Sequence, residues 1–177
     1  MIPVAKPSYY GYEKKFVLDA LKSTWLSDGA FVNEFENKIS RYVNSKFAIS
    51  TTSATTALHL VYLSMGLKKG DEIIVPGYGY LAAANIALQM GLNPIFADVD
   101  QDTFCVTAEN IKKKITLKTK LIIVIHTYGN VCDLDPIIKL AKSKKIPVLE
   151  DAAESLGSKY KNKQSGGIAN IGIFSFQ

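Results

Sequence analysis

The residues with the clearest chemical potential lie in one short stretch of the chain. An apolar run, Pro147–Leu149, leads directly into two carboxylates, Glu150 and Asp151, and a third carboxylate, Glu154, follows after two alanines. In open α/β sheets, ligands bind at the carboxyl ends of the strands, so an acid at the end of a buried strand is a candidate functional group. Asp151 is the strongest candidate of the three.

Asp151 and Glu154 are compatible with several kinds of chemistry. They could form a general acid/base pair, or Asp151 could pair with a protonated ring nitrogen. They could also bind a metal ion, although hard metals usually take more oxygen donors than this segment supplies. The structural alternative is that Asp151 only caps the following turn. A functional role is favoured because a buried acid needs a partner.

A second candidate site is Ser50–Thr56, a run rich in serine and threonine between an expected strand and an expected helix. Small hydroxyl residues there leave backbone amides free at a helix N-terminus, where anions bind readily. The alternative is an ordinary N-cap by Ser53 or Thr55. The stretch favours a phosphate site. It is neither a GxGxxG fingerprint nor a P-loop, so dinucleotide or ATP binding gains no support.

Two further strand ends carry residues of interest. Pro76–Tyr80 places glycines beside tyrosines, which suits a flat ring stacked on an aromatic face but equally an ordinary glycine turn. His126–Gly129 contains a lone histidine, and such a residue is more often a satisfied core histidine than a catalyst. No Gly-x-Ser-x-Gly motif occurs, and neither Cys105 nor Cys132 has a histidine at a useful distance, so no nucleophilic triad is predicted.

An alternation of strands and helices must position these groups. The expected strands cover residues 47–50, 72–75, 94–99, 121–125 and 147–150, followed by 157–163 and 168–177 around a glycine turn. Helical spacing of apolar residues is expected at 13–22, 32–43, 53–65, 81–90, 107–115 and from 133 onward. The uninterrupted apolar run 121–125 is typical of a strand covered on both faces. The pattern predicts an α/β fold with a mainly parallel sheet sandwiched by helices.

Composition narrows the class of protein. The chain has 177 residues, of which 47% are hydrophobic and 21% charged, as in ordinary globular domains. The net charge of +5 comes almost entirely from lysine, with Arg41 as the only arginine, and no basic tract is interleaved with aromatic residues. Nucleic-acid binding is therefore not expected. The cysteines and histidines show no metal-ligand spacing, so no metal site is predicted.

The apolar runs of the chain bear on its location. Met1–Lys6 does not resemble a signal peptide, because it lacks a basic region followed by an apolar one. The longest apolar stretch, Leu81–Leu92, is interrupted by polar residues and is too short to span a bilayer. We therefore expect a cytoplasmic protein without membrane contact.

Taken together, these segments resemble one protein family. In collinear order over essentially its whole length, the chain is similar to the large domain of the pyridoxal-phosphate-dependent sugar aminotransferases of the DegT/DnrJ/EryC1/StrS type, within fold type I. The matching pieces are Ile2–Pro7, Trp25–Gly29, Ser53–His59, Gly70–Pro76, Phe96–Asp100, His126–Gly129, Glu150–Glu154, Gly157–Tyr160 and Ser175–Phe176.

The resemblance implies how the chain would hold pyridoxal 5'-phosphate. Ala54 and Thr55 would bind the cofactor phosphate through amides and a hydroxyl, and Ser175 would add another hydroxyl. Tyr80 would stack on the pyridine ring. Gly79 departs from the threonine that is frequent in the family, which is expected to leave more room or flexibility beside the ring.

It also implies distinct roles for the three carboxylates. Asp151 would pair with the protonated ring nitrogen and keep the cofactor an electron sink. Glu154 would approach the phenolic oxygen of the cofactor, where a carboxylate must be protonated or hydrogen-bonded elsewhere to avoid repelling a phenolate. Glu150 is expected to be structural.

The implied enzyme transfers an amino group, with glutamate as the expected donor, to a keto group of a nucleotide-linked deoxysugar. Its active site would be shared within a homodimer. The family's Schiff-base lysine falls three residues beyond Gln177, so no catalytic residue is assigned within this chain, and the chain alone is expected to be inactive. Two alternatives remain: a sugar 3-dehydratase of the same fold, with histidine in place of the lysine, and a non-catalytic cofactor-binding fragment.

The expected organisation has two parts. Residues 1–30 form an N-terminal arm and the first helix, and residues 31–177 form the cofactor-binding large domain. Because the last expected strand runs to the final residue, we expect this domain to be truncated at its C-terminus.

Overall fold

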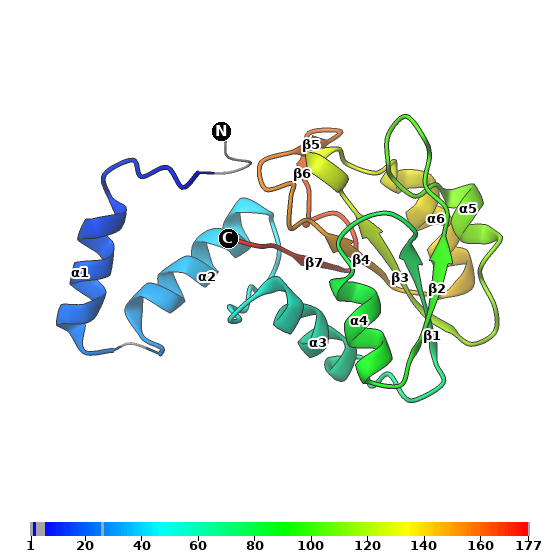
Figure 1. The fold of residues 1–177 in the computed structure, drawn as a ribbon, viewed down its shortest axis with the longest axis horizontal. Coiled ribbons are helices and arrows are strands. Elements are labelled where there is room, and N and C mark those ends of the chain that lie inside the picture. The colour runs from blue at the N-terminus through cyan, green and yellow to red at the C-terminus, as the bar shows by residue number, and fades with distance from the viewer. Residues whose placement is uncertain (1, 3–5, 26, 177) are drawn as a thin grey trace.

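A five-stranded sheet forms the centre of the computed structural model, which describes residues 2, 6–25 and 27–176 (Figure 1). Its strands lie in the order β2-β1-β3-β4-β7, and each neighbouring pair is parallel. The strands are β1 (Glu72–Pro76), β2 (Asn93–Ala97), β3 (Thr119–Ile125), β4 (Val148–Asp151) and β7 (Ile171–Ile173). This arrangement confirms the predicted α/β fold with a mainly parallel sheet.

Helices cover both faces of the sheet. The helices are α1 (Glu13–Ser23), α2 (Ala30–Tyr42), α3 (Ala54–Ser64), α4 (Ala82–Gln89), α5 (Ala108–Lys112), the short 3-10 helix η1 (Thr127–Gly129) and α6 (Leu134–Lys144). Side chains alternate along each strand, so neighbouring residues enter different cores. Ile123 and Leu149 pack with α3 and α4, whereas Ile122 and Val148 pack with α5 and α6. The inner strands β1, β3 and β4 are thereby held between two apolar layers, whereas β2 contributes only to the core with α5 and α6 and β7 only to the core with α3 and α4.

Local capping explains where two of the helices begin. The Ser53 hydroxyl accepts the Thr56 N–H (3.2 Å), and the Thr56 hydroxyl accepts the Ser53 N–H (3.0 Å), which is a reciprocal capping box at α3. The Thr107 hydroxyl likewise accepts the Asn110 N–H (3.2 Å) at the start of α5. Asp133 precedes α6 but does not cap it, because its carboxylate accepts the Tyr160 hydroxyl instead.

Two of the strand predictions are wrong. Residues 47–50 are extended but pair with no described strand, and Phe47 and Ile49 are 72% and 73% exposed. Residues 157–163 do not form one strand. They contribute to a hairpin of β5 (Lys159–Tyr160) and β6 (Lys163–Gln164), because Lys161 and Asn162 take positive φ values and close a tight turn. Within 168–177, the strand is limited to β7.

No helix within residues 2, 6–25 and 27–176 combines the length and the apolar character that crossing a membrane requires.

Candidate functional site

The carboxyl end of β4 buries two adjacent carboxylates on opposite faces of the sheet. Asp151 has the same orientation as Leu149, which lies in the core covered by α3 and α4. Glu150 has the orientation of Val148, which lies in the core covered by α5 and α6. Side-chain alternation therefore separates the two acids, although they are neighbours in sequence.

Glu150 is a fully buried structural carboxylate, as expected. It accepts a hydrogen bond from His126 Nε2 (3.0 Å) and from the backbone amides of Gly166 (2.8 Å), Ile168 (2.7 Å) and Ala169 (2.5 Å). Burial opposes its ionisation, but these four donors outweigh burial and lower the pKa of the carboxyl below its usual value. Glu150 thus fastens the loop that leads into β7.

His126 is a core histidine, in agreement with the interpretation of its sequence context. Its ring is fully buried, and Nδ1 accepts the Cys132 N–H (3.3 Å). A nitrogen that accepts carries no proton, so in the neutral ring the proton lies on Nε2 and is donated to Glu150. The His126 backbone N–H donates to the Asp151 carbonyl oxygen (3.1 Å), which ties the ends of β3 and β4 together.

Asp151 is the acid that has no cationic partner. Only 6% of the residue is exposed, and its Oδ1 accepts the Ala153 N–H (3.2 Å). Burial raises the pKa of this carboxyl above its usual value, while the Ala153 amide acts in the opposite direction. Among the ion pairs of the described residues, none involves Asp151. A buried carboxylate in this state is prepared to receive a cation from a ligand.

The N-terminus of α3 supplies two free backbone amides on the same side of the sheet. The capping box engages the N–H groups of Ser53 and Thr56. The N–H groups of Ala54 and Thr55, at the first two helical positions, have no intrahelical acceptor by helix geometry. They point along the helix axis, where the helix dipole also favours an anion.

Tyr62 connects α3 to the buried acid. This tyrosine is fully buried, and its hydroxyl donates to the Ala83 carbonyl oxygen of α4 (3.0 Å). Burial, and to a smaller extent the charge of Asp151, raise the pKa of the Tyr62 hydroxyl. The inner face of α3 therefore lies within electrostatic reach of Asp151.

Ser175 belongs to the same side of the sheet. Ile171 and Ile173 of β7 pack in the core under α3 and α4, and β7 contacts α3. Continuing the alternation by one step places Ser175, which is partly exposed, on that side as well. The fold thus brings Asp151, Ser175 and the α3 N-terminus to one side of the sheet, near the carboxyl ends of β4 and β7.

Tyr80 and Glu154 lie on loops at the carboxyl ends of β1 and β4. Tyr80 follows β1 and is 78% exposed, so its ring is open to a ligand. Glu154 is exposed, and its Oε2 accepts the Tyr128 N–H (2.7 Å). A carboxylate near a phenolate must be protonated or hydrogen-bonded elsewhere. The bond to the Tyr128 amide meets the second of these conditions for one oxygen of Glu154.

An aromatic group that sequence reasoning did not identify lies between these loops. The hydroxyls of Tyr78 and Tyr128 are hydrogen-bonded (2.8 Å), and the Tyr78 ring lies 5.3 Å from the Phe104 ring. Tyr128 adopts a positive φ of 54°, which turns its backbone N–H toward Glu154. The only available signal was that Tyr78 and Tyr128 each follow a predicted strand.

Gly79 lies close to the side chain of Ile125. Gly79 has a φ of +136°, and a Cβ there would lie 2.8 Å from Ile125 Cδ1. The side chain of Ile125 therefore already fills the space that a larger residue would need. The positive φ favours glycine at this position, and a larger residue would require the end of the Ile125 side chain to move.

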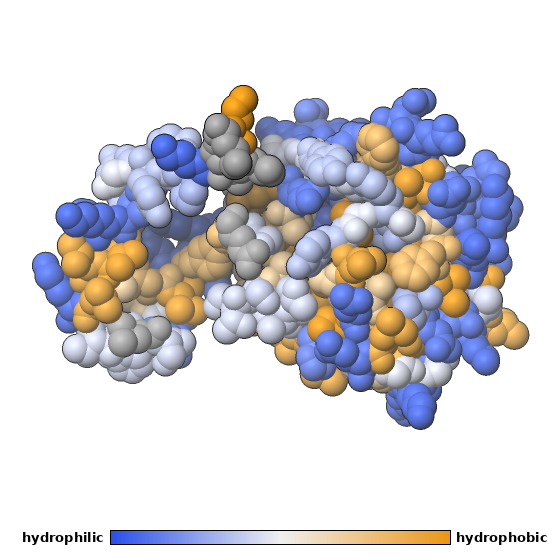
Figure 2. All heavy atoms as spheres, viewed as in Figure 1, coloured by the Kyte–Doolittle hydropathy of each residue, from blue (hydrophilic) through white to orange (hydrophobic). Residues whose placement is uncertain are grey.

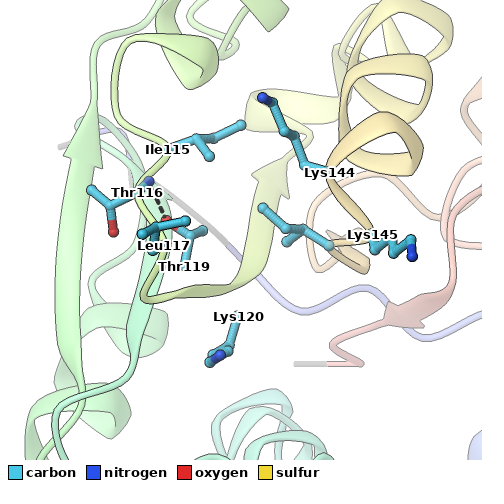
Figure 3. Close-up of a pocket in the computed structure, with 8 residues that line it drawn as sticks. Ile115, Thr116, Leu117, Thr119, Lys120, Lys144 and Lys145 are labelled. Atoms are coloured by element: carbon cyan, nitrogen blue, oxygen red, sulfur yellow. Dashed lines mark hydrogen bonds between the residues drawn. The ribbon is translucent and has the colours of Figure 1, made fainter.

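A cavity lies away from these residues, at the amino ends of β3 and β4 (Figure 3). It has a volume of about 480 Å³, and Lys120, Lys144 and Lys145 contribute to its lining. Figure 3 shows Lys120 and Lys145 pointing away from it, while the Thr119 hydroxyl accepts the Thr116 N–H (2.9 Å). Because its lysines do not converge, this cavity has no feature of a catalytic site.

Comparison with known proteins gives consistent matches over nearly the whole chain. The family described as "DegT/DnrJ/EryC1/StrS aminotransferase family" matches residues 10–177. The chain is 44% identical over 176 residues to the GDP-perosamine synthase of Escherichia coli O157:H7, covering 99% of this chain and 48% of that protein. It is 42% identical over 176 residues to the GDP-perosamine synthase of Caulobacter vibrioides, covering 99% and 47%.

Solved structures show the same fold. The PLP form of a putative sugar aminotransferase, Spr1654 from Streptococcus pneumoniae, superposes with a TM-score of 0.95 at 32% identity, covering 99% of this chain and 49% of that one. An E. coli GDP-4-keto-6-deoxy-D-mannose-3-dehydratase with bound hydrated PLP superposes with a TM-score of 0.90 at 31% identity, covering 97% and 46%. The chain spans about half the length of the curated relatives it matches.

Proposed function

Because the chain belongs to the DegT/DnrJ/EryC1/StrS aminotransferase family, we propose that it supplies the cofactor-binding part of an enzyme that uses pyridoxal 5'-phosphate to aminate a nucleotide-linked keto sugar. Residues 31–177 would form this part, with residues 1–30 as its N-terminal arm and first helix.

The observation that carries the proposal is the buried, unpaired carboxylate of Asp151. A protonated pyridine nitrogen is a cation that fits such a carboxylate, and the resulting charge-assisted hydrogen bond would lower the free energy of the ionised acid. When bound, the cofactor supplies an electron sink for a carbanion. The role of Asp151 is to hold the proton on the ring nitrogen, so that this sink stays effective.

The opposite end of the cofactor finds donors at α3. The free amides of Ala54 and Thr55, together with the Thr55 hydroxyl, suit a phosphate group, and the Ser175 hydroxyl would add a further donor. Among these residues the attraction for a phosphate would come from the amide and hydroxyl donors and from the helix dipole.

Tyr80 and Glu154 complete the expected contacts. The exposed ring of Tyr80 would stack on the pyridine ring. Glu154 would face the phenolic oxygen of the cofactor. One of its carboxylate oxygens accepts the Tyr128 N–H, which would reduce its repulsion of a phenolate.

The substrates follow from the relatives. Two of them are named GDP-perosamine synthase, so a nucleotide-linked keto-deoxysugar is the proposed acceptor, with glutamate as the amino donor. The net charge of +5 would favour the approach of a diphosphate-bearing molecule. We further propose a cytoplasmic homodimer in which a second copy completes the active site, and a lysine three residues beyond Gln177 as the proton-transferring group.

A second candidate function is dehydration at the neighbouring sugar carbon. It is favoured by the close superposition on the E. coli 3-dehydratase. The aminotransferase reading has the stronger support, because the two curated relatives described above are GDP-perosamine synthases at 44% and 42% identity. The residue three positions beyond Gln177 decides between them, since the dehydratase alternative requires a histidine there.

The proposal is tested on the full-length polypeptide. With pyridoxal phosphate and glutamate, we expect amination of GDP-4-keto-6-deoxymannose, detected as the amino sugar nucleotide by mass spectrometry. Borohydride treatment should covalently fix the cofactor on one lysine. Loss of the 3-hydroxyl without incorporation of nitrogen would assign the dehydratase function, and cofactor binding with neither product would assign a non-catalytic role.

A further inference from the structure

The two cysteines of the sequence, Cys105 and Cys132, lie close together in the fold, and both are buried and free. The Cys132 thiol donates to the Ile125 carbonyl oxygen at 3.2 Å, and the Cys105 sulfur lies 3.9 Å from that same oxygen. The Cys105 thiol also bonds to the Asn130 carbonyl oxygen at 3.3 Å. Two sulfurs that approach one acceptor are neighbours in space. Neither of them has a role in the proposed cofactor chemistry.

Both cysteines line a cavity of about 370 Å³ between the start of α5, the start of α6 and Tyr160 of β5. Thr103 and Pro136, which are exposed, also belong to its lining, so the cavity opens to solvent. Figure 2 shows hydrophilic residues over α5, whose first residue, Ala108, borders the cavity. A water molecule occupies about 30 Å³ in the liquid, so a small polar molecule has room to contact the thiols.

The two thiols differ in how readily they lose a proton. A hydrogen bond from the Cys132 thiol lowers the pKa of the Cys105 thiol, and burial acts in the opposite direction. The same bond, together with burial, raises the pKa of Cys132. Because the thiolate is the reactive form of cysteine, Cys105 is the nucleophile of the pair. Cys132 stays protonated beside it, at the distance of a contact partner.

We propose that Cys105 and Cys132 are a redox pair, which hydrogen peroxide converts from two thiols into one disulfide. The Cys105 sulfur attacks a peroxide oxygen, the O–O bond breaks, and the sulfur becomes a sulfenic acid while hydroxide leaves. The Cys132 sulfur then attacks the Cys105 sulfur, so an S–S bond forms, the S–O bond breaks and a second hydroxide leaves. The two hydroxides take the two thiol protons and depart as water. The two sulfurs lose two electrons in total, and the two peroxide oxygens gain them.

The disulfide would move a loop that reaches the candidate site. An S–S bond is about 2.05 Å long, so the segments that carry the two sulfurs must approach each other. Neither cysteine belongs to a helix or strand of the described chain, which confines this adjustment to loops. The Cys132 N–H donates to His126 Nδ1 (3.3 Å), and the same loop carries Tyr128, whose N–H donates to Glu154 (2.7 Å). Oxidation therefore shifts the backbone that holds Glu154.

Peptide mapping of the full-length polypeptide, first reduced and then treated with hydrogen peroxide, tests the proposal. We expect a disulfide-linked pair of peptides that contain Cys105 and Cys132, and we expect dithiothreitol to separate them again. In the reduced folded protein, an alkylating reagent should modify Cys105 roughly tenfold or more faster than Cys132. In urea, which removes the difference in environment, the two rates should be similar. Faster alkylation of Cys132 in the folded protein would contradict the assigned nucleophile.

Two matched serine variants separate the roles of the thiols. In Cys132→Ser, peroxide should leave Cys105 as a sulfenic acid that dimedone labels, because no second thiol reacts with it. In Cys105→Ser, Cys132 should stay unlabelled, because burial keeps it a thiol. Serine adds a polar group at a buried position, so alanine variants provide the same comparison in a fold without that cost. The mapping of the wild type requires no variant.

Hydrogen exchange without cofactor measures the effect on the loop. Oxidised wild type should differ from the reduced protein at residues 126–132, whereas peroxide-treated Cys105→Ser should not change there. Equal exchange in the oxidised and the reduced wild type would overturn the proposed shift of the backbone that holds Glu154.

Two results would overturn the redox pair itself. One is that peroxide leaves both thiols of the folded wild type unmodified. The other is oxidation of either cysteine to a sulfinic acid without any linkage between them. The inference does not rest on the proposed function, because the disulfide is detected without cofactor or substrate. A protein that forms the disulfide but aminates no sugar would refute the proposed function alone.

Discussion

Replacing Asp151 by asparagine separates the two consequences of burying this acid. The side chain is nearly isosteric, and the asparagine oxygen can still accept the Ala153 N–H. Only the charge is removed. We therefore expect opposite effects on the cofactor-free protein and on cofactor binding.

Without cofactor, Asp151→Asn should make the protein more stable than the wild type at neutral pH. Burial raises the folded-state pKa of Asp151 above its unfolded value of about 3.9, so the folded state binds more protons between these two pKa values. The stability of the wild type then falls as the pH rises from the unfolded pKa through the folded pKa, and it is constant above. The variant lacks this loss, so the difference grows with pH and then levels off.

With cofactor, the order should reverse. A hydrogen bond to a charged group contributes about 1.5–3 kcal/mol, and the 6% exposure of Asp151 means that solvent screens it little. Losing this hydrogen bond should raise the dissociation constant of pyridoxal phosphate by roughly 10- to 150-fold. The assay is a fluorescence titration of wild type and variant, with Asp102→Asn, an exposed acid, as the control. Equal affinities for wild type and Asp151→Asn would refute the assigned role.

Three substitutions test the framework around the site by urea-induced unfolding. Glu150→Gln should lower the free energy of unfolding by about 3–5 kcal/mol, because the amide cannot serve the four donors that converge there. The pKa of Glu150 is lowered in the folded state, so the wild type should lose this stability as the pH falls through that pKa. The variant should not show this loss. Parallel pH profiles of the two proteins would contradict the prediction. Gly79→Ala should lower the free energy of unfolding by about 1–3 kcal/mol. Adding Ile125→Val should restore part of this loss, because it removes the Cδ1 atom that the new methyl group would contact. Strictly additive effects of the two substitutions would exclude the close contact. Ser53→Ala should cost about 0.5–2 kcal/mol through loss of the α3 cap, and an unchanged midpoint would show that the capping box contributes nothing.

Much of the fold could be predicted from local patterns in the sequence. The continuous apolar run 121–125 required a strand covered on both faces, and the two cores on either side of β3 bear this out. Ser53 could be considered as a cap because a capping interaction spans only three residues. The prediction failed at residues 47–50, where apolar alternation was present but a pairing partner was not. A strand depends on its neighbour, and a single sequence does not show that neighbour.

The site was predictable to the extent that strand ends mark it. Asp151 and Glu150 could be separated in role, but that they face opposite cores follows from the register of β4. The contacts of Glu150 with three amides around residues 166–169 join positions distant in sequence, and no local pattern encodes them. The contact of Gly79 with Ile125 was missed for the same reason, because it depends on how the loop after β1 crosses the end of β3.

The central claim is that Asp151 holds a proton on the pyridine nitrogen of a bound cofactor. Nuclear magnetic resonance of pyridoxal phosphate labelled with a nitrogen isotope in the ring reports that protonation state directly. We predict a pyridinium signal with the wild-type protein at neutral pH and a neutral pyridine signal with Asp151→Asn. A neutral pyridine nitrogen in the wild-type complex, or the same pyridinium signal in both proteins, would contradict the account.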